Sequence, residues 1–138
     1  MFSSHTSASS ATQGRAANVV LWVLQGLLAF FFAFAGVNKL LGLQQEMVDN
    51  FARLGPLWFR YFVGVLELVG AAALVTPRLA GLGALWLAGV MVGAVLTHLL
   101  FQPPAYMATF PAVLCALFLV IAWGRRRQTL SVLADLRG

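Results

Sequence analysis

The sequence has few of the residues on which most soluble enzymes depend. Charged residues make up 9% of the chain, and Cys115 is its only cysteine. A single thiol excludes the dithiol exchange that a C-x-x-C pair performs. Of the two histidines only His98 lies in an apolar stretch, so one chain cannot hold a haem between two histidines, although two copies could. No glycine-rich nucleotide loop is present either. We expect no metal site and no covalently bound cofactor.

Apolar residues are in excess. They make up 61% of the sequence, more than a soluble domain of this size could bury. A membrane span takes roughly 20 helical residues, and four apolar runs are long enough: Asn18–Leu41, Phe59–Val75, Leu79–Phe101 and Tyr106–Trp123. Because these runs do not alternate apolar and polar residues, they indicate helices and not barrel strands. The sequence predicts an all-α integral membrane protein.

The connections between the runs predict how the helices pack. The segments "TPR" and "QPPA" are too short to separate the helices that they join, which predicts an up-down-up-down four-helix bundle. The longer first connection places four apolar residues on one face of a helical wheel: Met47, Val48, Phe51 and Leu54. It therefore predicts an amphipathic interfacial helix between the first two spans, which serves either as a linker or as a lid over a site.

Charge placement predicts the orientation of the chain. We divide it into a disordered polar tail (1–16), a transmembrane domain (17–124) and a basic tail (125–138). Six of the nine basic residues fall on the side of the termini: Arg15, Arg78, Arg125, Arg126, Arg127 and Arg137. By the positive-inside rule both termini are cytoplasmic. The basic tail is expected to contact anionic lipid, and no nucleic acid is expected as a partner.

Small residues predict the faces along which helices touch. They include Gly89 and Gly93 in a G-x-x-x-G pattern, and the ladder Ala80, Ala84 and Ala88. Pro111 lies inside the fourth run and predicts a kink.

One carboxylate lies within the second apolar run, in "GVLELVG". Its neighbours Gly64, Gly70 and Ala71 lie on the same side of the helix and turn Glu67 toward the bundle. An unpaired charge in a membrane is costly, so a partner is expected. Lys39 and His98 fall at a similar depth in the outer half, together with Asn38, whereas Gln25 lies on the opposite half. We predict a Lys39–Glu67 pair with His98 beside it. Two alternatives stay open: Lys39 reaches the outer head groups, and His98 is an interfacial residue.

Three stretches together resemble the DoxX family of small four-helix membrane proteins. They are "FAFAGVNKLLG", "GVLELVGAAALVTPRLAGLGAL" and "MVGAVLTHLLF", and the resemblance extends from about Leu21 to Ala122. It implies a four-helix bundle with Lys39, Glu67 and His98 as the matching polar positions. It also implies a bacterial inner-membrane protein associated with membrane redox chemistry, although some distant relatives resemble assembly factors.

These observations leave two classes of function open. The first is a quinone-linked oxidoreductase subunit, with Glu67 and His98 as candidate catalytic residues and Lys39, Asn38, Glu67 and His98 as candidate cofactor-binding residues. Four phenylalanines are expected to wall the quinone: Phe30, Phe31, Phe32 and Phe34. The second class is a non-catalytic scaffold or assembly factor for a membrane partner. A carrier of another lipophilic molecule would use the same pocket, and the oligomeric state, a homo-oligomer included, stays open.

Overall fold

Helices make up all of the regular structure in residues 2–138, which the computed structural model describes, with side-chain surroundings described from Gly14 onward. Four of its segments are long and apolar enough to cross a membrane: Gly14–Leu41, Leu57–Leu74, Ala80–Leu100 and Ala105–Gly124. The elements in order are α1 (Phe2–Leu41), α2 (Gln45–Leu54), α3 (Leu57–Leu74), α4 (Ala80–Leu100), η1 (Ala105–Ala108), α5 (Thr109–Gly124) and α6 (Arg126–Arg137). The predicted all-α membrane fold is confirmed, including the short helix between the first two spans.

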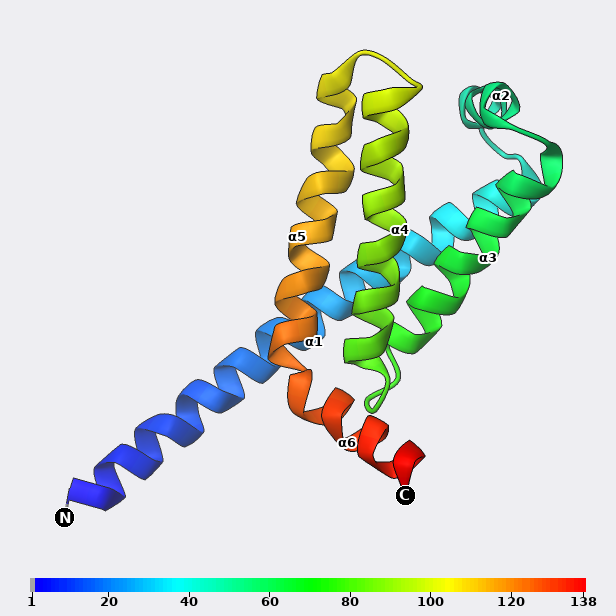
Figure 1. Ribbon diagram of the computed structural model, residues 1–138. Helices are drawn as coiled ribbons and strands as arrows, with labels where there is room; N and C mark the ends of the chain where they lie inside the picture. Colours follow the sequence, from blue (N-terminus) through cyan, green and yellow to red (C-terminus); the bar gives the residue numbers. More distant parts are fainter. Residues whose placement is uncertain (1) are drawn as a thin grey trace.

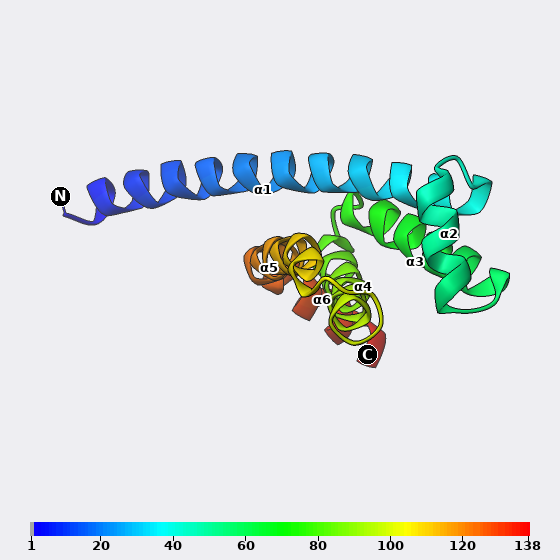
Figure 2. The same cartoon turned by 90° about the horizontal axis from the view of Figure 1, so that it is seen from above.

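The spans are arranged as two antiparallel pairs that diverge toward one end. α1 packs chiefly against α3, and α4 packs chiefly against α5. In Figure 1 the α4–α5 pair stands upright while α1 and α3 run obliquely. The pairs are closest near the α3–α4 turn and spread apart toward α2, and Figure 2 shows α1 lying along one side of the other spans. This divergence leaves room for a site at the α2 end.

Close packing holds the two pairs together near the α3–α4 turn. Phe32 and Phe118 are almost fully buried, and their rings make an edge-to-face contact at 5.2 Å. The predicted ladder is confirmed, because Ala80, Ala84 and Ala88 are all buried. Further core residues are Leu28, Leu74, Leu87 and Ile121.

The G-x-x-x-G pattern does not mark a helix contact, which corrects the prediction. A Cβ added to Gly89 or to Gly93 would meet no described atom within 4 Å. By contrast, a Cβ on Gly70 would lie 2.5 Å from Leu87. Gly70 is therefore a close-approach glycine, whereas Gly89 and Gly93 face open space where the pairs have diverged.

The predicted kink at Pro111 is also absent from this structure. α5 begins at Thr109, after the 3₁₀ turn η1, so Pro111 lies in the first helical turn. Backbone N–H groups of a first turn have no intrahelical acceptor, so proline costs no hydrogen bond there. The departure from α-helix in the fourth apolar run is the 3₁₀ turn η1, which comes before Pro111.

A second polar cluster joins the spans at the end opposite α2. Gln25, which is fully buried, donates from Nε2 to the Leu74 carbonyl oxygen (2.8 Å) and accepts from Arg125 Nε (2.8 Å). Arg125 Nη1 donates to Asn18 Oδ1 (2.8 Å), and the guanidinium lies over the Trp22 ring. These contacts tie α1 to α3 and α5, and they confirm that Gln25 is separate from the Glu67 region.

The two terminal segments are helical in the structure. α1 begins at Phe2, and the division of the chain into a polar tail, a transmembrane domain and a basic tail stays a prediction. The basic tail forms α6, and an Arg78–Asp135 ion pair joins it to the α3–α4 turn.

The orientation of the termini stays a prediction, and the structure shows which of the basic residues at the α2 end is exposed. Of the three basic residues at the α2 end, Arg60 is buried and Lys39 is paired, so Arg53 is the exposed one. We expect a reporter fused after Gly138 to be cytoplasmic and one inserted in the segment 42–58 to be external. Alkaline phosphatase and green fluorescent protein fusions distinguish these outcomes. An external C-terminus would overturn the assignment.

Candidate functional site

The position of Glu67 follows from a close crossing of α1 and α3. Gly36 and Gly64 face each other there, and a Cβ on Gly36 would lie 2.8 Å from the Gly64 carbonyl oxygen. Lys39 and Glu67 each follow one of these glycines by three residues. Because helical side chains lean toward the N-terminus of their own helix, the two antiparallel helices lean these side chains toward each other. The glycine crossing therefore sets the distance at which the charges meet.

Lys39 and Glu67 form an ion pair at that crossing. The distance from Nζ to Oε1 is 2.7 Å, and the side chains are 16% and 3% exposed. The Lys39 ammonium also lies 5.8 Å from the centre of the Phe51 ring of α2. The predicted pair is confirmed, and Lys39 does not leave the bundle for the outer surface.

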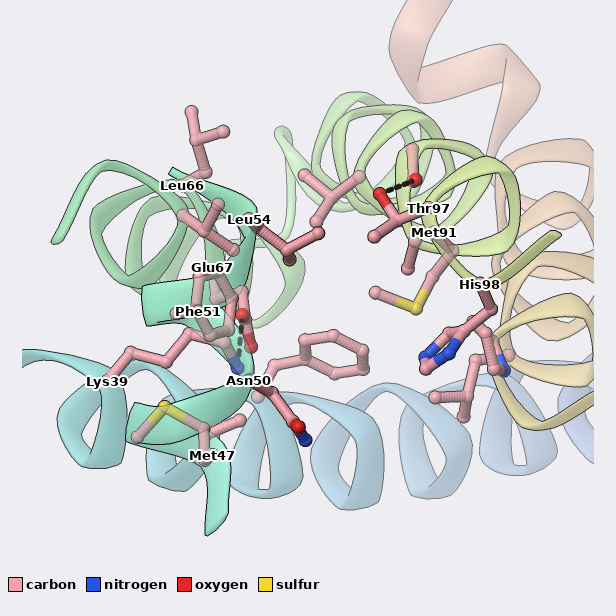
Figure 3. Close-up of a pocket in the computed structure, with 18 of the residues that line it drawn as sticks. Lys39, Met47, Asn50, Phe51, Leu54, Leu66, Glu67, Met91, Thr97 and His98 are labelled. Atoms are coloured by element: carbon pink, nitrogen blue, oxygen red, sulfur yellow. Dashed lines mark hydrogen bonds and ion pairs between the residues drawn. The ribbon is translucent and has the colours of Figure 1, made fainter. Parts of the chain in front are cut away.

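A pocket of about 1020 Å³ lies between the diverging helix pairs and includes this ion pair in its wall. Figure 3 shows Lys39 and Glu67 on one side and His98, from α4, on the opposite side. Apolar residues form most of the wall, with contributions from α1 to α5; among them are Phe31, Phe32, Phe59, Leu66, Met91, Phe110 and Leu114. The pocket is thus apolar with a few polar groups placed apart, the usual character of a small-molecule site.

His98 carries a polar atom that no described residue satisfies. Its Nδ1 is buried and has no hydrogen-bond partner in the part of the chain that the structure describes. The structure brings His98 into the same pocket as Lys39 and Glu67, as predicted, but its Nδ1 makes no hydrogen bond to either residue. A buried polar atom without a partner costs free energy, so a bound group that pairs with Nδ1 would remove that cost.

Asn38 lies behind the pocket and does not line it. Its side chain donates from Nδ2 to Gln44 Oε1 (2.8 Å) and accepts from the Gln44 backbone N–H (3.1 Å). These bonds hold the turn between α1 and α2. The structure therefore gives Asn38 a positioning role toward Gln44, which does line the pocket. The predicted direct contact of Asn38 with a cofactor has no support in this geometry.

Two of the four predicted phenylalanines line the pocket. Phe31 and Phe32 do so, whereas Phe30 and Phe34 are 77% and 55% exposed on the outer face of α1. Helical periodicity separates these residues, since four residues within the five positions 30–34 cannot share one face.

Amide side chains at the α2 end of the pocket were not identified from the sequence. The lining includes Gln44, Gln45, Asn50 and Gln102, and Gln102 Nε2 donates to the Asn50 carbonyl oxygen (3.2 Å). That bond joins the loop after α4 to α2. Three of these residues lie within or next to the amphipathic segment, so a lid interpretation of that segment could have found them.

The comparison with protein families covers this whole site. The model of the DoxX-like family matches residues 23–121. This chain belongs to the DoxX-like family. The matched range contains Lys39, Glu67 and His98, while α6 lies outside it. No curated protein and no solved structure matches the chain. The family assignment agrees with the resemblance found in the sequence, and it describes a multi-pass membrane protein.

Proposed function

We propose that this protein binds a quinone, or a lipophilic molecule with similar polar groups, as the membrane component of a redox system. The observation that carries the proposal is the placement of Lys39–Glu67 and His98 on opposite walls of one apolar pocket. A quinone has an apolar ring with two carbonyl oxygens on opposite sides. The Lys39 ammonium can donate to one oxygen and the His98 ring to the other, because each is a hydrogen-bond donor in a mostly apolar wall.

Proton transfer to the bound molecule is compatible with the same residues. Reduction of a quinone to a quinol takes up two electrons and two protons. Glu67 and His98 border the pocket, and carboxyl and imidazole groups are side chains that commonly transfer protons to bound molecules. The proposal assigns the electrons to the redox cofactor of a partner protein.

A binding measurement tests the proposal directly. We expect the full-length protein in lipid nanodiscs to bind decylubiquinone, and His98→Leu to weaken that binding about 5- to 10-fold, the worth of one neutral hydrogen bond. His98→Gln keeps a donor and should retain more affinity than His98→Leu. Quenching of tryptophan fluorescence reports binding, because Trp86 lines the pocket.

The matched control is Tyr106→Leu. Tyr106 is 72% exposed, lies at the same end of the bundle, and is not part of the pocket wall. Its replacement should leave the affinity unchanged. If the wild-type protein binds no quinone and instead purifies with a stoichiometric membrane protein, the quinone proposal is wrong and the scaffold function gains support.

A further inference from the structure

The walls of the pocket differ in how well they exclude lipid. On the side between α1 and α5, the Phe31 and Phe110 rings meet edge to face with their centres 5.9 Å apart. Phe31 also contacts Phe32, which packs against Phe118 in the core. This aromatic row bridges α1 and α5 at one level, where Phe31 and Phe110 are still 42% and 60% exposed.

The end of the pocket is covered by α2. Gln102 donates to the Asn50 carbonyl oxygen, and the Lys39 ammonium lies over the Phe51 ring. Leu54, the last residue of α2, also lines the pocket. A long molecule cannot leave in this direction without displacing α2.

The side between α3 and α4 is open along part of its length. Gly89 and Gly93 line the pocket and are nevertheless exposed, and a Cβ on either would meet no described atom within 4 Å. On α3 the facing wall is formed by Phe62 and Leu66, and Phe62 is 51% exposed. We name this opening the α3–α4 slit, formed by Phe62, Leu66, Trp86, Gly89 and Gly93.

Trp86 ends the slit on the side of the α3–α4 turn. Its Nε1 donates to the Leu66 carbonyl oxygen (2.9 Å), which joins α4 to α3 at that point. Because of this bond, no side chain of the slit has a free hydrogen-bond donor or acceptor. Trp86 is nevertheless 47% exposed, and its exposed part faces the surroundings of the helices. Because both flanking helices are membrane spans, those surroundings are lipid.

We infer that the ligand carries a single long apolar tail, and that this tail passes through the α3–α4 slit into the bilayer. The inference rests on the proposed function and adds the ligand class and its route. A polar head held between Lys39 and His98 lies in the pocket to which the slit is joined. An alkyl or isoprenoid tail suits the slit because every group along the slit is apolar or already hydrogen-bonded. The tail also requires glycine at positions 89 and 93, because larger side chains there would occupy its path.

Two quinone probes with the same head group test the route. Decylubiquinone carries a ten-carbon tail, and 2,3-dimethoxy-5-methyl-1,4-benzoquinone carries none. In nanodiscs we expect Gly93→Leu to weaken decylubiquinone binding by about ten-fold or more, while binding of the tail-less probe changes by less than about two-fold. Gly89→Leu should act in the same direction. Gly26→Leu is the matched control, because Gly26 is exposed on α1, lies outside the pocket and has no described neighbour within 4 Å of an added Cβ.

The outcomes separate this inference from the proposed function. If wild-type protein binds neither probe, the proposed function fails and the tail route fails with it. If wild-type protein binds both probes and the two slit variants weaken both equally, or weaken neither, the tail does not use the slit although the head-group site stands. Binding of the tail-less probe shows that a variant is folded. If Gly93→Leu cannot be purified, Gly89→Leu tests whether the tail uses the slit.

Discussion

Glu67→Ala is expected to destabilise the protein strongly, and Glu67→Gln much less. Glu67 is 3% exposed and holds the Lys39 ammonium at 2.7 Å. Removal of one partner leaves the other charge buried without compensation, which costs about 3–5 kcal/mol in a buried pair. Glutamine keeps an oxygen that accepts from Lys39, so part of the interaction survives. Thermal unfolding in detergent, followed by circular dichroism, should rank the proteins as wild type, Glu67→Gln, then Glu67→Ala.

A double variant distinguishes loss of the pair from loss of the glutamate alone. Lys39→Met with Glu67→Leu removes both charges and fills the space with apolar groups. Replacement of a buried ion pair by apolar residues is often neutral or stabilising, so we expect this variant to recover most of the stability that Glu67→Ala loses. If Glu67→Ala alone is as stable as wild type, the charge is not buried between the helices as the structure has it.

The same variants report on function. The double variant should fold but bind decylubiquinone poorly, because it lacks the donor proposed for one carbonyl oxygen. If redox or proton-linked activity depends on the carboxylate, Glu67→Gln should lose that activity while remaining folded. Full activity of Glu67→Gln in cells would show that Glu67 is a structural contact and that the proton role is wrong.

The Lys39–Glu67 pair could be predicted because two independent features of the sequence agree. Helix rise sets the depth of each residue, and small neighbours indicate which face of a helix packs. Gly64, Gly70 and Ala71 lie beside Glu67, and all three are buried with it in α3. The cost of an isolated charge in lipid then requires a partner at the same depth. Each step uses local information that the sequence contains.

The pocket itself could not be predicted, since it depends on the angle between the helix pairs. Small residues indicate either a close helix contact or an opening, and the sequence does not distinguish these. Gly70 makes a close contact with Leu87, whereas Gly93 borders the pocket. Similarly, Asn38 is buried near the end of α1, but the turn after α1 directs its side chain to Gln44, and Asn38 does not line the pocket. Such outcomes depend on tertiary geometry and not on residue type.

The crossing of α1 and α3 is the feature on which the site depends most, and Gly36→Ala is expected to disrupt it. The added Cβ would lie 2.8 Å from the Gly64 carbonyl oxygen and 2.8 Å from Leu68 Cγ. A backbone oxygen cannot turn aside as a flexible side chain can, so the helices must separate. Overpacking of this kind costs about 1–3 kcal/mol, and Gly36→Leu should cost more and prevent folding.

Gly26→Ala provides a control on the same helix. Alanine favours a helix over glycine by up to about 1 kcal/mol at either position, so the local effect of the two substitutions is equal. Gly26 has no described neighbour within 4 Å of an added Cβ, and the net effect there should be neutral or stabilising. The thermal midpoint is therefore expected to fall for Gly36→Ala and to hold or rise for Gly26→Ala. Because separation of α1 from α3 also pulls Lys39 away from Glu67, Gly36→Ala should weaken decylubiquinone binding as well. Equal midpoints for the two variants would mean that α1 and α3 do not approach this closely in the membrane.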